Sequence, residues 1–153
     1  MEPGTGNKEP GTARGFRKLV AWQKADELAA AVFKLTRLIP ASDRWLGIQL
    51  LRAAVSVPAN IAEGYGRGAL GDYLRFLEIA NGSLNEVEYY LHFLGHNDIL
   101  PAEQLTTAGK LQHETGALLS GLSRSLRVKL GEAGGWRRGL VREDQAEYVA
   151  GDD

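Results

Sequence analysis

Apolar residues recur every three or four positions along most of the chain, which is the period of an amphipathic α-helix. Proline and glycine interrupt this pattern, which predicts helices over residues 16–38, 44–63, 71–94 and 101–130. No stretch alternates apolar and polar residues for long enough to predict a strand. Short connections force consecutive helices to run antiparallel, so the sequence predicts an all-α fold, an up-down-up-down four-helix bundle over residues 16–130.

The second predicted helix differs from the others because it is apolar on two faces. One apolar stripe is formed by Ile48, Leu51, Val55 and Ala62. The other is formed by Leu50, Ala54, Val57 and Ile61. A four-helix bundle covers one face of each helix, so a second apolar face favours burial against another chain. We therefore expect the protein to self-associate.

A line of polar residues separates the two stripes, formed at helical spacing by Arg52, Ser56, Asn60 and Glu63. A corresponding line on the third helix is formed by Glu78, Asn81, Asn85, Glu88 and His92. These lines contain few groups suited to proton transfer, so we interpret them as structural and expect them to hydrogen-bond to each other within the bundle or across a subunit contact. Pro58 lies in the same helix and leaves one carbonyl without its helical partner. Pro58 and the polar line beside it therefore predict a structural bend in the second helix rather than an active site.

The two ends of the chain differ in composition from the helical body. Residues 1–15 are rich in glycine and proline, and residues 131–153 are Gly-rich and acidic, so we expect a disordered lead and a disordered tail.

The chain has no cysteine, which excludes disulfides, thiolate catalysis and iron–sulfur clusters. It also lacks an apolar run of membrane-spanning length, so we expect a cytoplasmic protein with no membrane partner.

Charge is unevenly distributed over the predicted bundle, although the formal net charge of the chain is −1. The topology brings the start of the first helix, the end of the second, the start of the third and the end of the fourth to one pole. This basic pole contains the acids Glu63 and Asp72 and eight basic residues: Arg14, Arg17, Lys18, Arg67, Arg75, Arg124, Arg127 and Lys129.

A basic surface of this kind suits the backbone of RNA or another single-stranded nucleic acid, and Tyr65 lies near enough in sequence to contact a base. A solvated rim without a ligand is the alternative interpretation. The acidic tail emerges from the same pole, so we expect residues 143–153 to compete with nucleic acid for it.

Three residues could form a metal site, because Glu88, His92 and His96 share one helical face. The Glu-x-x-His pairs of di-metal helical bundles are missing from the sequence. Histidines near the end of a helix ordinarily interact with its dipole and with solvent. We therefore expect no metal and no cofactor.

Two further patterns give little support to catalysis. The glycines from Gly64 to Gly71 follow a predicted helix rather than a strand, which favours a helix C-cap and a turn over a phosphate-binding loop. Ser120, Ser123 and Ser125 lack a neighbouring base and an orienting acid, so the sequence offers no activated nucleophile.

Three segments carry a resemblance to a known family: FRKLVAWQKADELAAAVFKLT, QLLRAAVSVPANIAEGYGR, and FLEIANGSLNEVEYYL with a following LG. They span Phe16 to about Leu100 and resemble the four-helix-bundle family often encoded in intervening sequences of bacterial large-subunit ribosomal RNA genes. The chain is also similar to the accessory variability determinant of diversity-generating retroelements, which works beside a reverse transcriptase. The resemblance implies a homopentamer without known catalysis and with a role near nucleic acid. Trp45 departs from the family pattern, which usually has glycine there, and His96 replaces an aromatic residue.

These observations leave three classes of function open. The first is a non-enzymatic oligomeric scaffold whose basic pole binds RNA or a nucleic-acid-processing protein. The second is a protein-binding adaptor, in which the pole docks an acidic partner surface. The third is an enzyme, for which Glu63, Glu88 and His92 are poor candidates because no perturbing neighbour is evident in the sequence.

Overall fold

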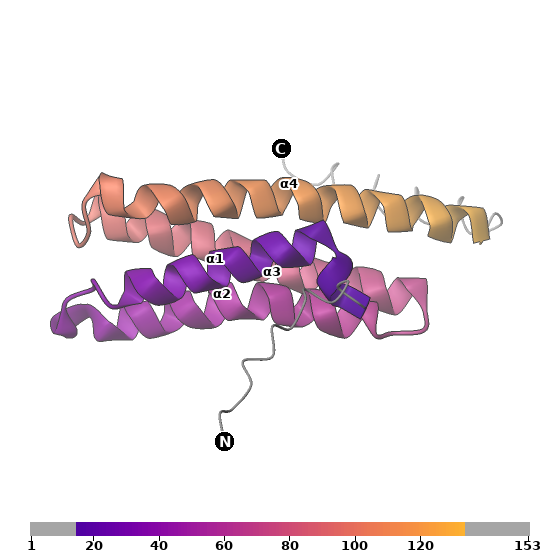
Figure 1. Ribbon diagram of the computed structural model, residues 1–153, viewed down its shortest axis with the longest axis horizontal. Coiled ribbons are helices and arrows are strands. Elements are labelled where there is room, and N and C mark those ends of the chain that lie inside the picture. The colour runs from indigo at the N-terminus through magenta and orange to yellow at the C-terminus, as the bar shows by residue number, and fades with distance from the viewer. Residues whose placement is uncertain (1–14, 134–153) are drawn as a thin grey trace, which may run out of the picture.

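The computed structural model describes residues 15–133, which form a bundle of four helices (Figure 1). A 3₁₀ turn, η1 (Gly15–Lys18), precedes α1 (Val20–Thr36), and a second, η2 (Ala41–Asp43), leads into α2 (Arg44–Tyr65). The remaining helices are α3 (Leu70–His96) and α4 (Ala102–Ala133). No strand occurs within this range, so the predicted all-α fold is confirmed. Residues 1–14 and 134–153 lie outside the described part of the chain, and so does the acidic stretch 143–153.

Each helix packs against two others, because α1 and α3 each lie between α2 and α4. Successive helices alternate in direction along the long axis of the bundle (Figure 1). The up-down-up-down topology is therefore confirmed. The end of α2, the start of α3 and the last turns of α4 lie toward one end of this axis, and η1 packs against α1 and α2 on the same side (Figure 1).

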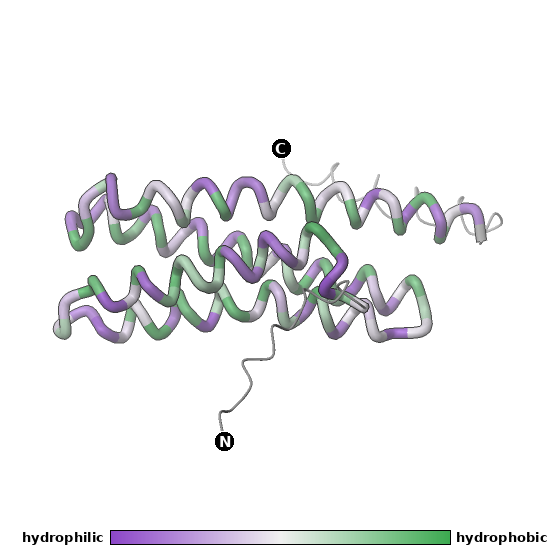
Figure 2. The backbone as a smooth tube through the Cα atoms, viewed as in Figure 1, coloured by the Kyte–Doolittle hydropathy of each residue, from purple (hydrophilic) through white to green (hydrophobic). Residues whose placement is uncertain are grey.

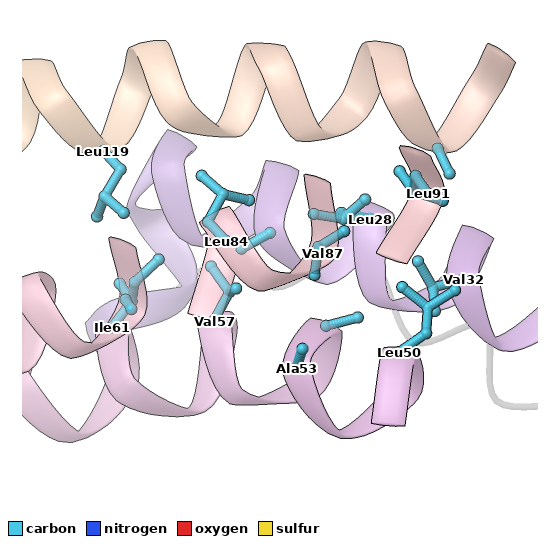
Figure 3. Close-up of a cluster of buried hydrophobic side chains, with 14 of the residues drawn as sticks. Leu28, Val32, Leu50, Ala53, Val57, Ile61, Leu84, Val87, Leu91 and Leu119 are labelled. Carbon is cyan, nitrogen blue, oxygen red and sulfur yellow. The ribbon is translucent and has the colours of Figure 1, made fainter. Parts of the chain in front are cut away.

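The core consists of aliphatic side chains that recur at helical spacing. Hydrophobic and hydrophilic residues interchange at short intervals along every helix (Figure 2). The hydrophobic ones meet at the bundle centre (Figure 3), where the labelled residues are Leu28, Val32, Leu50, Ala53, Val57, Ile61, Leu84, Val87, Leu91 and Leu119. Because each fully buried aliphatic side chain contributes about 1.5–3 kcal/mol, this layer supplies most of the stabilisation. No helix in residues 15–133 has both the length and the apolar character needed to cross a membrane.

The helix boundaries differ from the predicted ones at both ends of the bundle. The first helix does not begin at Phe16, because Leu19 is extended and separates η1 from α1. The side-chain amide of Gln23 donates to the Arg17 carbonyl at 2.8 Å, and the rings of Phe16 and Trp22 meet with centres 5.0 Å apart. These contacts hold η1 against α1. At the other end, α4 continues to Ala133, three residues beyond the predicted end.

The two apolar stripes of α2 lie in different environments. The stripe that contains Leu50 and Val57 is buried in the core. In the other stripe, the exposed fraction is 52% for Ile48 and 47% for Val55. The helix passes through Pro58 without ending. One apolar face of α2 thus builds the bundle, while the other is exposed at Ile48 and Val55 and half-buried at Leu51 and Ala62.

Candidate nucleic-acid interface

Seven of the eight basic residues assigned to the pole are described, and all seven are exposed. η1 contributes Arg17 and Lys18, the loop after α2 contributes Arg67, and the second turn of α3 contributes Arg75. The last turns of α4 contribute Arg124, Arg127 and Lys129. Arg14 lies outside the described residues. The described members therefore form two groups, one around the α2–α3 connection and one on α4.

Three of the four residues in the first group lie over rings of a set that we call the aromatic cluster: Tyr65, Tyr73 and Phe76. The Lys18 ammonium lies 5.7 Å from the centre of the Tyr65 ring. The guanidinium carbons of Arg67 and Arg75 lie 4.9 and 5.1 Å from the centre of the Phe76 ring. A cation over a ring is held in place by the electrons of the ring while its hydrogen-bond donors stay available. The cluster therefore orients three exposed cations, of which Lys18 and Arg75 form no ion pair in residues 15–133 and Arg67 pairs with Glu63.

Gly64 allows the aromatic cluster to form. It is buried near the end of α2, and a Cβ atom at this position would lie 2.8 Å from Cδ2 of Tyr73 and 2.9 Å from Cβ of Phe76. Only a residue without a side chain lets α2 and α3 approach this closely. The predicted end of α2 at Glu63 was two residues early, because the helix continues through Gly64 to Tyr65; the predicted glycine C-cap is confirmed at Gly66.

Ion pairs neutralise only part of the basic pole. Arg67 pairs with Glu63 at 2.6 Å within α2 and its following loop, and Arg127 pairs with Glu78 of α3 at 3.8 Å. Both pairs are exposed, where such contacts contribute about 0–1 kcal/mol. In residues 15–133 the other five cations of the pole form no ion pair. The surface thus keeps uncompensated positive charge.

Two residues of the polar line of α2, Ser56 and Asn60, make hydrogen bonds within the bundle, but the partner on α3 differs from the predicted one. The side-chain amide of Asn60 donates to the carbonyl and the hydroxyl of Ser56 at 2.8 and 2.9 Å. The Ser83 hydroxyl of α3 donates to the Ser56 hydroxyl at 2.9 Å. The predicted α3 line does not face α2: Glu78 and Asn81 lie beside α4, and Asn85, Glu88 and His92 are exposed. The rotation of α3 about its axis, which the sequence pattern did not specify, explains why the two lines do not meet within the bundle. That they meet across a subunit contact stays a prediction.

Arg52 and Glu63 also lie outside this small network. Arg52 is exposed, and Glu63 pairs with Arg67 instead of a residue of α3. Ser83 of α3 therefore hydrogen-bonds to Ser56 of α2, close to Pro58, and Asn60 binds Ser56 from within α2. The Asn60 amide donates to the carbonyl of Ser56, whereas Pro58 leaves the carbonyl of Ala54, four residues before it, without its helical partner.

The histidines of α3 form a stacked pair. The ring centres of His92 and His96 are 5.2 Å apart, and both residues are exposed. Within the described range, no three His, Cys, Asp or Glu residues are placed to hold a metal ion, and this includes Glu88 with the two histidines.

Tyr73 carries a buried hydroxyl with no hydrogen-bond partner in the described part of the chain. Burial raises the pKa of the Tyr73 phenol above its ordinary value, and the nearby Tyr65 raises this pKa further. The folded state therefore holds the phenol proton more tightly than the unfolded state does. This difference contributes stability below about pH 10, and the contribution is lost as pH rises through the folded pKa.

We expect Tyr73→Phe to leave stability at pH 8 unchanged or raise it by about 1 kcal/mol, because it removes an unpaired buried hydroxyl. The variant should also lose less stability than the wild type between pH 8 and pH 10.5. Urea unfolding at the two pH values, followed by circular dichroism, measures both effects. A variant that is less stable at pH 8 would show that the hydroxyl has a partner in solution.

The comparisons with known proteins agree with this fold. Residues 17–121 match the sequence profile of a family described as "23S rRNA-intervening sequence protein". The chain is also similar to a protein of unknown function from the S23 ribosomal protein family of Bacteroides thetaiotaomicron, whose crystal structure it matches with 26% identity and a TM-score of 0.63. That match covers 68% of this chain and 98% of the other. No curated protein in the comparison matches the chain. The chain belongs to the 23S rRNA-intervening sequence protein family.

Proposed function

We propose that the protein is a homo-oligomeric, non-enzymatic scaffold whose basic pole binds the backbone of single-stranded RNA. We propose five subunits, because the family resemblance implies a homopentamer. The observation that carries the proposal is the aromatic cluster, which holds Lys18, Arg67 and Arg75 against rings at the surface.

The chemistry of the cluster fits RNA for two reasons. Exposed cations that contact phosphates release condensed counterions, which makes affinity high at low salt and steeply dependent on salt. Aromatic rings beside such cations offer surfaces on which unpaired bases stack, whatever their sequence. Tyr65 and Phe76 are both half-buried, so part of each ring is accessible at the surface. The cluster thus combines backbone and base contacts.

The test compares two pairs of substitutions of equal charge. Arg67→Gln with Arg75→Gln removes both cations from Phe76. Arg37→Gln with Arg44→Gln removes two cations from the opposite end of the bundle, and Arg37 likewise lies 4.7 Å from the centre of a phenylalanine ring, Phe33. The readout is the fluorescence anisotropy of a labelled single-stranded RNA at several salt concentrations.

We expect the Arg67/Arg75 variant to bind RNA about tenfold more weakly at low salt. Its slope of log affinity against log salt should decrease by about 1.4, the value for two lost contacts with a single strand. The Arg37/Arg44 variant should bind like the wild type. Equal losses in both variants would contradict a localised site, and binding of an acidic peptide in place of RNA would favour the adaptor function.

The oligomeric part of the proposal rests on an exposed apolar face shared by α2 and α3. The exposed fractions are 57% for Trp45, 43% for Ile79 and 59% for Tyr89, in addition to those of Ile48 and Val55. The Trp45 ring meets Phe93 of α3 edge-on, with centres 6.5 Å apart, so the two helices form one continuous surface. Contiguous apolar surface of this kind marks a protein contact.

A second copy of the chain is the partner that best fits this face. The spacing of residues along the helices places Arg52 on the α2 part of this face and Glu86 on the α3 part. These two residues form no ion pair with each other in the described structure. Two copies can therefore exchange opposite charges within an apolar contact. Gly82 lies between Ile79 and Glu86, and a Cβ atom there would meet nothing within 4 Å. This gap in the side-chain layer leaves room for a partner to approach α3.

Substitutions at Gly82 test the face without disturbing the bundle. Gly82→Ala should keep the oligomer, whereas Gly82→Arg should dissociate it, because a long charged side chain would occupy the contact. Light scattering after gel filtration measures the mass of each variant, and circular dichroism confirms that both are folded. An unchanged mass for Gly82→Arg would exclude this face as the subunit contact.

A further inference from the structure

A polar cleft of about 350 Å³ lies between α3 and α4, on the side of α3 that faces α4 rather than the aromatic cluster. Its floor is formed by Leu77 and Leu119, which are buried core residues. Its walls are polar: α3 contributes Glu78 and Asn81, and α4 contributes two serines, Ser120 and Ser123, and two arginines, Arg124 and Arg127.

Helical spacing explains why these side chains converge. The other α4 residues follow Ser120 by three, four and seven positions, so all four share one face of the helix over two turns. Glu78 and Asn81 are three positions apart on the facing side of α3. The cleft therefore combines two guanidinium groups, two hydroxyls and one amide, all of which donate hydrogen bonds, with one carboxylate.

Most of these donors are unused by the protein. Across residues 15–133 the side chains of Asn81, Ser120, Ser123 and Arg124 make no hydrogen bond or ion pair with another protein group. Arg127 has only the long contact of 3.8 Å to Glu78. A cleft with several free donors and an excess of positive charge suits an anion with several acceptor oxygens.

We propose that this cleft binds a phosphate group. Guanidinium groups match the geometry of phosphate oxygens, and the hydroxyls and the amide can satisfy the oxygens that remain. We take the phosphate to be a phosphodiester of the RNA strand held at the basic pole, and in this respect the inference rests on the proposed function. Arg75, which lies over Phe76 of the aromatic cluster, precedes Glu78 by less than one turn of α3, so one strand can contact both places.

Glu78 weakens the site in its present form. Its carboxylate lines the cleft and is drawn to Arg127, so it competes with a phosphate for the same guanidinium. Removing this charge should strengthen binding, whereas removing the charge of Arg124 should weaken it. A change in net charge alone would also strengthen binding in one variant and weaken it in the other. A charge substitution far from the cleft is therefore needed as a control.

The experiment uses the full chain and two probes. The first probe is inorganic phosphate, titrated against chloride at matched ionic strength and observed by NMR through the side-chain amide of Asn81. The second is the labelled single-stranded RNA, observed by anisotropy. The variants are Glu78→Gln, Ser123→Ala and Arg124→Gln, and Arg44→Gln at the opposite end of the bundle serves as the control.

We expect Arg124→Gln to weaken RNA binding about three- to tenfold, Ser123→Ala to weaken it about twofold, and Glu78→Gln to strengthen it about threefold, because charge-assisted hydrogen bonds at exposed sites are partly screened. Arg44→Gln should change it less than twofold. A saturable response of Asn81 to inorganic phosphate shows that a free phosphate suffices. If the RNA effects occur without that response, the site requires a phosphodiester within a strand.

The remaining outcomes separate the two proposals. If RNA fails to bind but phosphate shifts Asn81 saturably, the cleft site stands and the RNA scaffold is overturned. If RNA binds but all three cleft variants behave like Arg44→Gln, and Asn81 does not respond to phosphate, the cleft site is overturned and the RNA scaffold stands.

Discussion

Replacing Gly64 with alanine should destabilise the protein by about 2 kcal/mol. The added methyl group would lie 2.8 Å from the Tyr73 ring and 2.9 Å from Cβ of Phe76, and 3.2 Å from the backbone oxygen of Tyr73. Two of these neighbours belong to or adjoin the backbone of α3, so the helices must separate to admit it. Overpacking of this kind costs about 1–3 kcal/mol, partly offset by the higher helix propensity of alanine. Urea unfolding followed by circular dichroism measures the effect.

Gly82→Ala is the matched control for this prediction. Gly82 also lies inside a helix, but a Cβ atom there meets nothing within 4 Å. The substitution should therefore raise the stability of the folded chain by about 0.5–1 kcal/mol. If both variants were equally stabilised, α2 and α3 could not be in the close contact that forms the aromatic cluster.

Replacing Leu84 with alanine should cost about 3–4 kcal/mol of unfolding free energy. Leu84 of α3 is 1% exposed and lies in the central layer of the core (Figure 3). Truncation removes three buried carbon atoms and leaves a cavity, and buried Leu→Ala changes cost about 2.7–5 kcal/mol. The same substitution at Leu130, which is 41% exposed on α4, should change stability by less than about 0.5 kcal/mol.

A second substitution tests whether the cavity lies where the structure places it. Gly116 of α4 faces Leu84, and a Cβ atom there would lie 3.5 Å from Cδ2 of Leu84, at ordinary contact distance. In the Leu84→Ala background, Gly116→Ala should recover more stability than it adds to the wild type, because its methyl group partly fills the cavity. Strictly additive effects of the two changes would contradict the contact.

The fold could be predicted from the sequence because it depends on features that repeat. The spacing of apolar residues marks each helix, Pro40, Gly66 and Pro101 lie at or near helix ends, and short connections leave one antiparallel arrangement. The two apolar stripes of α2 were recognised for the same reason, but their spacing did not show which of them enters the core. The end of α4 was placed too early because the polar composition after Leu130 resembles that of a loop, whereas the helix continues to Ala133.

The partners of individual side chains could not be predicted in this way, because they depend on how each helix is rotated about its axis. The pattern on α3 allowed the line from Glu78 to His92 to face α2, yet Ser83 is the residue that contacts Ser56. Phe76 was overlooked as a functional residue because it reads as one more apolar position. Its place directly after Arg75 was the available signal, but the approach of Arg67 from the preceding loop appears only in three dimensions.

The phosphate cleft was hidden for a similar reason. The serines of α4 were considered only as nucleophiles, and they lack a base. As hydrogen-bond donors they need no base, but their convergence with Asn81 requires the contact between α3 and α4. The sequence predicted positive charge at one end of the bundle, and the structure places Lys18, Arg67 and Arg75 over the aromatic cluster and Arg124 and Arg127 in the cleft.

The most direct test of the proposed scaffold is the mass of the full chain in solution, measured by light scattering alone and with a short single-stranded RNA, at low and at moderate salt. We expect a stable oligomer at both salt concentrations, and a further gain of RNA mass at low salt only. A monomer that gains no RNA mass at low salt would contradict both the assigned subunit contact and the assigned role of the basic pole.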